Sequence, residues 1–242
     1  MLRLAVPLLV WLAQAPAWAQ DVQLAGLSSG KALLVINGEA PRFLSPGQTV
    51  AGVRLLSLLI DDADITHETD NAAHIAWITT WIDRASRLGA DTVRVIGGHA
   101  APDTDSRARC RAAFKTLALE AFVRGVRVRT ENWFPLLCNP AELNDFLRAL
   151  QGAVGLTFDF GNWGGDDKYI HLEAIAEHAE GCHAKCSYDG DIPDEADFEA
   201  CIRILKGNGY SGTFTLVHAP GESIWDALAY QRSVIERIYS EA

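Results

Sequence analysis

Three residues of the types that bind metal ions lie at the ends of predicted strands: Glu131, Asp159 and His183. The best defined of these strands is an apolar run that ends at Asp159, before a turn of Gly, Asn and Trp. A buried strand has this pattern when its C-terminal end presents an acid to a site. Two carboxylates and one imidazole on separate strands suit Mn²⁺, Mg²⁺, Co²⁺ or Zn²⁺ and leave positions open for substrate oxygens.

The chemistry that such a site would support is proton transfer beside a carbonyl group. A divalent ion polarises a carbonyl and its neighbouring hydroxyl, and it thereby acidifies the adjoining C–H. A carboxylate at the same rim can then carry the proton. Lys185 follows His183 by two residues, so both side chains lie on one face of the strand. Its ammonium is a candidate to bind a substrate oxygen or stabilise an enediolate; the alternative is a solvated lysine at the rim.

Other residues near the strand ends are candidates to bind the substrate, and each has a structural alternative. The arginine either binds substrate or pairs with a carboxylate of a neighbouring strand. The asparagines either support the site by hydrogen bonds or form turns, and the tryptophans form either a wall for a sugar's apolar face or part of the core. These candidates are Arg94, Asn132, Trp133, Asn162 and Trp163. Three further acids are expected in a solvated loop: Asp61, Asp62 and Asp64.

The elements that position these residues are strands and helices in alternation. The predicted strands are 53–59, 92–98, 126–132, the strand ending at Asp159, 182–188 and 213–218, and the predicted helices are 71–88, 107–124, 140–150, 171–180, 194–208 and 224–240. Six β/α units with strands apolar enough for burial on both faces predict a parallel α/β sheet. Polar strand ends at one rim favour a TIM barrel. A doubly wound sheet is the alternative, but no Gly-rich phosphate loop follows any strand.

The N-terminal part of the chain has a different character. Residues 1–19 combine one Arg, an apolar stretch and an Ala-Trp-Ala ending, which is typical of a signal peptide and predicts a periplasmic or secreted protein. No later run has the about 20 apolar residues that a membrane span needs. Residues 20–52 contain two short β-type runs joined by Ser28-Ser29-Gly30, which predict a hairpin. The barrel domain is expected over 53–242.

Composition and cysteine usage restrict the partners and give a conflicting indication of the compartment. The formal charge of −10 argues against a nucleic-acid backbone as the main partner. The chain has five cysteines, and their odd number and irregular spacing do not form a disulfide framework. Cys182 and Cys186 lack a second Cys/His pair at zinc-finger spacing, so buried thiols are the preferred interpretation. Such cysteines are typical of a cytoplasmic protein, whereas the leader indicates export.

From Val53 onward the sequence resembles the xylose isomerase-like TIM barrels, which include sugar-phosphate isomerases, epimerases and apurinic-endonuclease-like relatives. The matching segments, in chain order, are 81–85, 88–90, 92–95 with 97–98, 131–133, 159–162, 183–185 and 209–212. The resemblance implies that Glu131, Asp159 and His183 are metal ligands and that Glu131 also takes part in proton transfer. It implies isomerisation or epimerisation of a small sugar or related hydroxy-carbonyl compound. Residues 21–52 resemble the leader region of exported bacterial retropepsin-like aspartic proteases, without the catalytic Asp-Thr/Ser-Gly triplet.

Two departures from the family pattern affect these expectations. The last family strand usually ends in a second glutamate that binds metal and acts as acid/base, and Val217 stands there instead. His218 follows on the opposite strand face, and Glu222 could reach in from the loop. In addition, two β/α units need about 60 residues, and far fewer precede the strand 53–59. Three alternatives are expected: the barrel is incomplete, or another chain completes it, as in a homo-oligomer, or it is joined to a leader from a different gene.

Three functions follow from these observations. The first is a metal-dependent isomerase, epimerase or related lyase that acts on a small polyhydroxylated carbonyl compound. The second is a catalytically degenerate barrel that binds sugar or metal, which Val217 and the missing units favour. The third is phosphodiester cleavage at abasic DNA, which usually needs a richer set of His, Asp and Glu ligands. The negative charge and the few ligands disfavour this third function.

Overall fold

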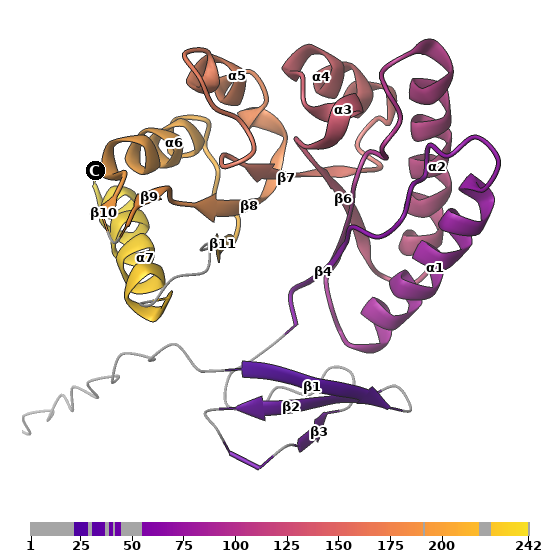
Figure 1. Cartoon of the computed structure of the whole chain (residues 1–242), viewed down its shortest axis with the longest axis horizontal. Coiled ribbons are helices and arrows are strands. Elements are labelled where there is room, and N and C mark those ends of the chain that lie inside the picture. Colours follow the sequence, from indigo (N-terminus) through magenta and orange to yellow (C-terminus); the bar gives the residue numbers. More distant parts are fainter. Residues whose placement is uncertain are drawn as a thin grey trace, which may run out of the picture.

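Six strands that alternate with helices form one parallel sheet, as the sequence predicts. Its spatial order is β11-β8-β7-β6-β5-β4, and every neighbouring pair is parallel. The sheet curls into a half-barrel (Figure 1), which confirms the predicted incomplete TIM barrel of six β/α units. The strands are β4 (Ser57–Ile60), β5 (Thr92–Val95), β6 (Arg127–Glu131), β7 (Gly155–Asp159), β8 (Ala179–Lys185) and β11 (Phe214–Val217).

The structure is a computed structural model, and it describes residues 22–28, 31–36, 39–40, 42–44, 55–190, 192–217 and 224–241. The predicted signal peptide, residues 1–19, lies outside the described residues, as do His218 and Glu222. Among the described residues, no helix combines the length and apolar character needed to span a bilayer.

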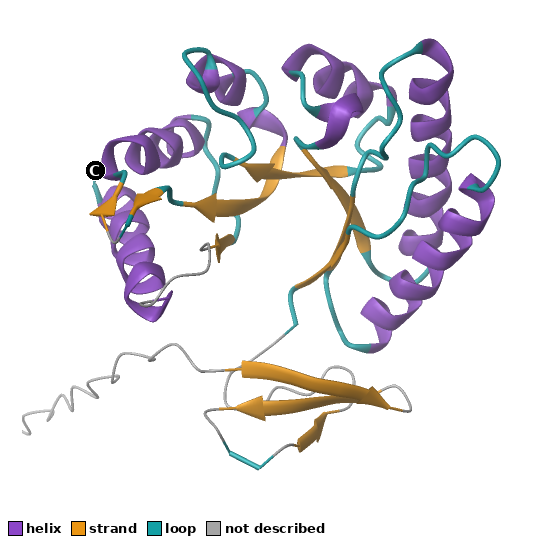
Figure 2. Ribbon diagram, in the orientation of Figure 1, coloured by secondary structure: helices purple, strands orange, loops and turns teal. Residues whose placement is uncertain are grey.

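The helices cover the outer, convex side of the curled sheet (Figure 2), and the core lies between the two layers. Alternate residues of the strands, such as Val93, Val128, Leu156 and Phe158, are buried on this side. The helices are α1 (Asn71–Arg87), α2 (Thr104–Phe122), α3 (Phe134–Leu137), α4 (Pro140–Ala149), α5 (Lys168–Glu173), α6 (Glu195–Gly207) and α7 (Ile224–Ser240).

Local sequence signals fix several of the helix ends. The Asp103 side chain accepts a hydrogen bond from the Ser106 N–H, and the Asp103 N–H donates to the Ser106 hydroxyl oxygen, which forms a capping box at the start of α2. Asn139 caps α4, and Pro140 occupies its first position. A backbone N–H at this position would have no partner within the helix, so proline is tolerated there. The chain leaves α1 through Gly89, which has a φ of 70°.

The segment 171–180 differs from its prediction as one helix. It contains the end of α5, a 3₁₀ turn over Ala176–His178 and the start of β8 at Ala179. Leu156 pairs with Ala179 and Thr157 with Gly181, so Glu180 is an extra residue in a bulge of β8. Two hydrogen bonds from Arg127 hold its carboxylate. The next strand also ends earlier than predicted, because Tyr188–Asp189 (β9) pairs with Ile192–Pro193 (β10) in a separate hairpin.

The N-terminal segment forms a separate three-stranded antiparallel sheet. Val22–Ser28 (β1) pairs with Lys31–Ile36 (β2), and the last pair is Ser28 with Lys31, which confirms the predicted hairpin. Arg42–Leu44 (β3), which the sequence pattern does not predict, adds to β2. None of these strands joins the six-stranded sheet.

Candidate metal site

The three predicted metal ligands meet at the carboxyl ends of three adjacent strands. Because β6, β7 and β8 are neighbours and parallel, residues at their carboxyl ends lie at one edge of the sheet. Glu131, Asp159 and His183 are at most 7% exposed, and each has a potential ligand atom within 4.8 Å of those of the other two. His183 Nδ1 lies 3.4 Å from Asp159 Oδ2 and 3.6 Å from Glu131 Oε2.

Both oxygens of Glu131 have a neighbouring donor. Asn162 Nδ2 donates a hydrogen bond of 2.6 Å to Oε1, and Arg94 Nε lies 3.0 Å from Oε2. Arg94 is itself buried and also pairs with Asp61, which follows β4. These contacts fix the orientation of the Glu131 carboxylate.

Asp61 is the residue of this cluster that sequence reasoning missed, since it was expected in a solvated loop. The signal was present: Leu59 pairs with Arg94 across β4 and β5, and Asp61 lies two residues farther along the same face. Asp64 also differs from this expectation. Its Oδ1 accepts hydrogen bonds from the backbone N–H and hydroxyl of Thr66 and from the His99 N–H.

Asp159 is held by its side chain and by its backbone. Lys185 Nζ lies 2.7 Å from Oδ2, and the Gly161 N–H donates a 2.8 Å bond to Oδ1. The Asn132 amide donates to the Asp159 carbonyl at 2.7 Å and accepts from its N–H at 2.8 Å. Asn132 is fully buried and joins β6 to β7, so its place is behind Asp159 rather than in the open site.

The pKa values of Asp159 and His183 move in opposite directions. Burial would raise the pKa of Asp159, but the adjacent His183 and Lys185 side chains outweigh burial and lower it below its ordinary value. Burial would lower the pKa of His183, but Asp159 and Glu131 outweigh burial and raise it. Each shift favours the charged form, so the carboxylate and the imidazolium stabilise one another.

The two tryptophans predicted at the site lie in different environments. Trp133 is 38% exposed, and the Arg94 guanidinium carbon lies 5.9 Å from its ring centroid. Trp163 is partly buried against the core, and its ring meets that of His171 edge-on at 5.8 Å. Trp133 therefore presents an open aromatic face beside the charged cluster, whereas Trp163 packs as a core residue.

Val217 lies on the same sheet face as the cluster. It pairs with Lys185 across β8 and β11, and Thr215 pairs with His183. Paired residues of a parallel ladder point to the same face, so Val217 and Thr215 face the concave side with Lys185. Among the described residues, β11 therefore brings no acid to the site.

The donor set of this cluster fits a divalent metal ion. Glu131 Oε2 and Asp159 Oδ2 are buried and accept no hydrogen bond within the described part of the chain, although Arg94 and Lys185 lie beside them. One imidazole nitrogen and two carboxylate oxygens are ligands of Mg²⁺, Mn²⁺, Co²⁺ and Zn²⁺ in proteins. The charges of Arg94 and Lys185 mean that a bound ion would share both carboxylates with cations of the protein.

Solved structures with the same fold include magnesium-bound and sugar-bound proteins. A xylose isomerase-like TIM barrel protein from Mycobacterium smegmatis in complex with magnesium aligns with a TM-score of 0.63 at 18% identity, over 78% of this chain and 74% of that one. The 3-keto-D-glucoside 4-epimerase of E. coli aligns with a TM-score of 0.61 at 15% identity, over 75% and 80%. D-allulose 3-epimerase from Methylomonas sp. in complex with D-allulose aligns with a TM-score of 0.58 at 18% identity, over 77% and 76%.

These identities are low, so the structural matches establish the fold alone. A search of curated protein sequences finds no match to the chain. The sequence model of the family described as "Xylose isomerase-like TIM barrel" matches residues 50–234, which is most of the chain. The chain therefore belongs to the xylose isomerase-like TIM barrel family.

Proposed function

We propose that this protein is a divalent-metal-dependent enzyme that isomerises or epimerises a small sugar or related hydroxy-carbonyl compound. The observation that carries the proposal is the convergence of Glu131, Asp159 and His183 from three adjacent strands, with potential ligand atoms within 4.8 Å of one another. The sugar epimerases among the structural neighbours support this substrate class.

The roles of the surrounding residues follow from their positions. A bound divalent ion would polarise the substrate carbonyl and acidify the adjoining C–H. Glu131 is the candidate to carry the proton, because Arg94 and Asn162 fix its carboxylate at the rim. Lys185, whose side chain is 35% exposed, can turn its ammonium toward a negatively charged substrate oxygen. The open ring of Trp133 can pack against the apolar face of a sugar.

A second function is favoured by the last strand of the sheet. Val217 faces the concave side beside Lys185, where the family usually has its second glutamate. A two-base epimerase needs one acid/base on each face of the substrate carbon, and within the described residues only the Glu131 side supplies one. A barrel that binds sugar or metal without turnover is the function that this feature supports.

The first test is the metal content of the purified protein. We expect about one divalent ion per chain, since the described residues contain one three-ligand cluster. Inductively coupled plasma mass spectrometry on the wild type would be compared with Asp159→Ala, which removes one ligand. Asp145→Ala is the matched control, because Asp145 is 79% exposed on α4. An ion retained by Asp159→Ala would contradict the assignment of the site.

The second test separates turnover from binding. The metal-loaded protein would be incubated with ketohexoses in deuterium oxide, and ¹H NMR would follow exchange of the C–H beside the carbonyl. Exchange that is lost in Glu131→Gln supports the enzyme. Sugar binding by calorimetry without exchange supports the degenerate barrel instead.

A further inference from the structure

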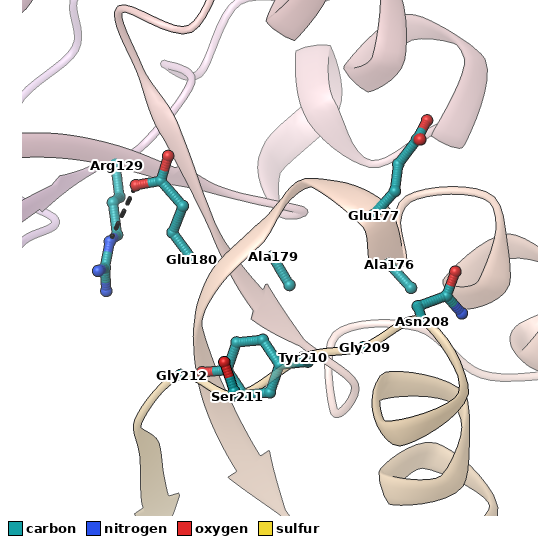
Figure 3. Close-up of a pocket in the computed structure, with 10 residues that line it drawn as sticks. All are labelled: Arg129, Ala176, Glu177, Ala179, Glu180, Asn208, Gly209, Tyr210, Ser211 and Gly212. Carbon is teal, nitrogen blue, oxygen red and sulfur yellow. Dashed lines mark ion pairs between the residues drawn. The ribbon is translucent and has the colours of Figure 1, made fainter.

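A polar cavity lies at the amino end of the strands, opposite the candidate metal site (Figure 3). Its volume is about 400 Å³, which lies within the usual range for sites of small molecules. The cavity is bounded by Arg129 of β6, by the start of β8 and its preceding turn, and by the loop 208–212 before β11. None of the three candidate metal ligands lines it.

Two guanidinium groups, those of Arg127 and Arg129, share the carboxylate of Glu180 at this end of the sheet. Arg127 donates to both oxygens of Glu180, Nε to Oε2 at 3.0 Å and Nη2 to Oε1 at 2.5 Å, and it also donates to two backbone carbonyls. Glu180 is thus neutralised by Arg127. Arg129 is the second guanidinium beside this single carboxylate, and its Nε lies 3.6 Å from Oε2, beyond hydrogen-bond distance.

Arg129 is therefore a cation with unused donors. Its side chain is 20% exposed, its Nε is buried without an acceptor, and its guanidinium donates no hydrogen bond to any residue in the described part of the chain. Burial lowers the pKa of Arg129, and the attraction of Glu180 only partly offsets this effect. A buried donor without a partner is unfavourable, and an anion with free oxygen lone pairs would satisfy it.

Two glycines make the space in which these charged groups lie. A Cβ on Gly181 would collide with Arg129 Nη1, and one on Gly155 would collide with the Glu180 carboxylate. Both glycines belong to strands at positions where a side chain would fill the end of the barrel. The guanidinium thus occupies a trough formed by the absence of side chains on β7 and β8.

The loop 208–212 adds donors on another side of the same cavity. The backbone N–H groups of Ser211 and Gly212 donate to no described residue, and both residues are exposed. The Ser211 hydroxyl is a further donor. Tyr210, whose hydroxyl donates to the Thr213 carbonyl at 2.7 Å, forms a fixed aromatic wall. Glu177 also borders the cavity, but its carboxylate points away from Ser211 and Gly212 in Figure 3 and lies 3.6 Å from His178 Nε2.

We propose that this cavity binds a small oxyanion, a phosphate or carboxylate group, between the Arg129 guanidinium and the donors of Ser211 and Gly212. A planar guanidinium with several free N–H groups matches the geometry of both anions. Exposed N–H and hydroxyl groups without a protein acceptor are further donors for an anion in this cavity. The volume admits a small organic phosphate or carboxylate as well as the inorganic ion.

Thermal unfolding of the full chain tests this site with inorganic phosphate and malonate in separate arms, each matched in ionic strength with sodium chloride. At ten times its dissociation constant, measured by calorimetry, the bound anion should raise Tm by about 3–6 °C. A response to phosphate alone or to malonate alone identifies which source of oxyanion the site prefers. Wild-type protein that responds to neither anion would overturn the proposal.

Arg129→Met identifies where the anion binds. In anion-free buffer its Tm should stay close to that of the wild type, because Arg127 still pairs with Glu180 when the longer Arg129 contact is removed, and the response to anions should disappear. A response of unchanged size in Arg129→Met would overturn the proposal by placing the anion elsewhere, for example at Arg94 and Lys185. A lower Tm in anion-free buffer with an unchanged response would mean that Arg129 only supports Glu180.

Two further variants keep the test decisive if Arg129→Met does not fold. Arg129→Lys retains the charge but loses the forked donors, so the dissociation constant of the anion should rise about tenfold. Arg232→Met is the matched control, because Arg232 is 55% exposed on α7, pairs with Glu236 and does not line the cavity. It should respond to the anion as the wild type does, and a loss of response in this control would contradict the assignment to Arg129.

Discussion

At the carboxyl end of the strands, the buried carboxylates of Glu131 and Asp159 each contact a cation of the chain, whereas at the amino end Arg129 shares the carboxylate of Glu180 with Arg127. The first cluster is held together without any added ion, and a metal would enter it in competition with Lys185. The second is a cation in a trough that has room for a ligand. The difference shows that the two ends of one half-barrel are prepared for ligands of opposite charge.

The largest expected effect is at the carboxyl end, in Arg94→Met. Arg94 and Glu131 have side chains that are 4% and 2% exposed, so the variant leaves a buried carboxylate without its cation. Breaking such a pair from one side costs about 3–5 kcal/mol of unfolding free energy. Urea unfolding would measure it. A second substitution, Glu131→Gln, should recover most of the loss, and equal losses in Arg94→Met and Arg129→Met would remove the contrast between the two ends.

The second effect concerns the competition between Lys185 and a metal ion. Lys185 is 35% exposed while Asp159 is fully buried, so Lys185→Met should lower the stability of the metal-free protein by about 1–2 kcal/mol. In this variant the Lys185 ammonium no longer competes with a metal ion for the Asp159 carboxylate, so the affinity for Mn²⁺ should rise about tenfold. Calorimetric titration of Mn²⁺ into the metal-free wild type and into metal-free Lys185→Met measures the two affinities. If Lys185 serves the substrate alone, the affinity for Mn²⁺ will not change.

The convergence of Glu131, Asp159 and His183 could be predicted from the sequence, because carboxyl ends of adjacent parallel strands must lie together. The position of the Arg94–Asp61 contact could not be predicted in this way, because it depends on the register between β4 and β5. The amino-end cavity depends on a bulge at Glu180 and on missing side chains at two glycines, and neither has a periodic signal. The short helix α3, four residues with a proline, was missed for the same reason.

The third effect concerns Asp64, an acid that lies outside both candidate sites and accepts hydrogen bonds from Thr66 and His99. Burial would raise the pKa of Asp64, but bonds from Thr66 and His99 outweigh burial and lower it below 3.8. Since its folded pKa is lower than its unfolded pKa, Asp64 contributes stability that is present above about pH 4 and is lost as the pH falls through the folded value. Asp64→Asn should cost about 1 kcal/mol at pH 7 and flatten the stability profile below pH 4. Unfolding curves from pH 2 to 7 measure this, and an unchanged profile would contradict the role of Asp64.

The smallest expected effect on stability is that of Trp133→Ala, which tests whether substrate binds at the carboxyl end of the strands. Trp133 is 38% exposed at the carboxyl rim and its ring contacts that of Phe134, so its removal should lower the unfolding free energy by about 1 kcal/mol or less. Trp163→Ala is the matched control, because Trp163 packs against the core and its loss should cost about 2–4 kcal/mol. If the open ring of Trp133 is the wall for the substrate, Trp133→Ala should weaken ketose binding about tenfold, as calorimetry would show, while the amino-end response to phosphate stays intact. Loss of both responses in Trp133→Ala would mean that the two ends of the sheet are coupled, and the half-barrel would then have to be treated as one site.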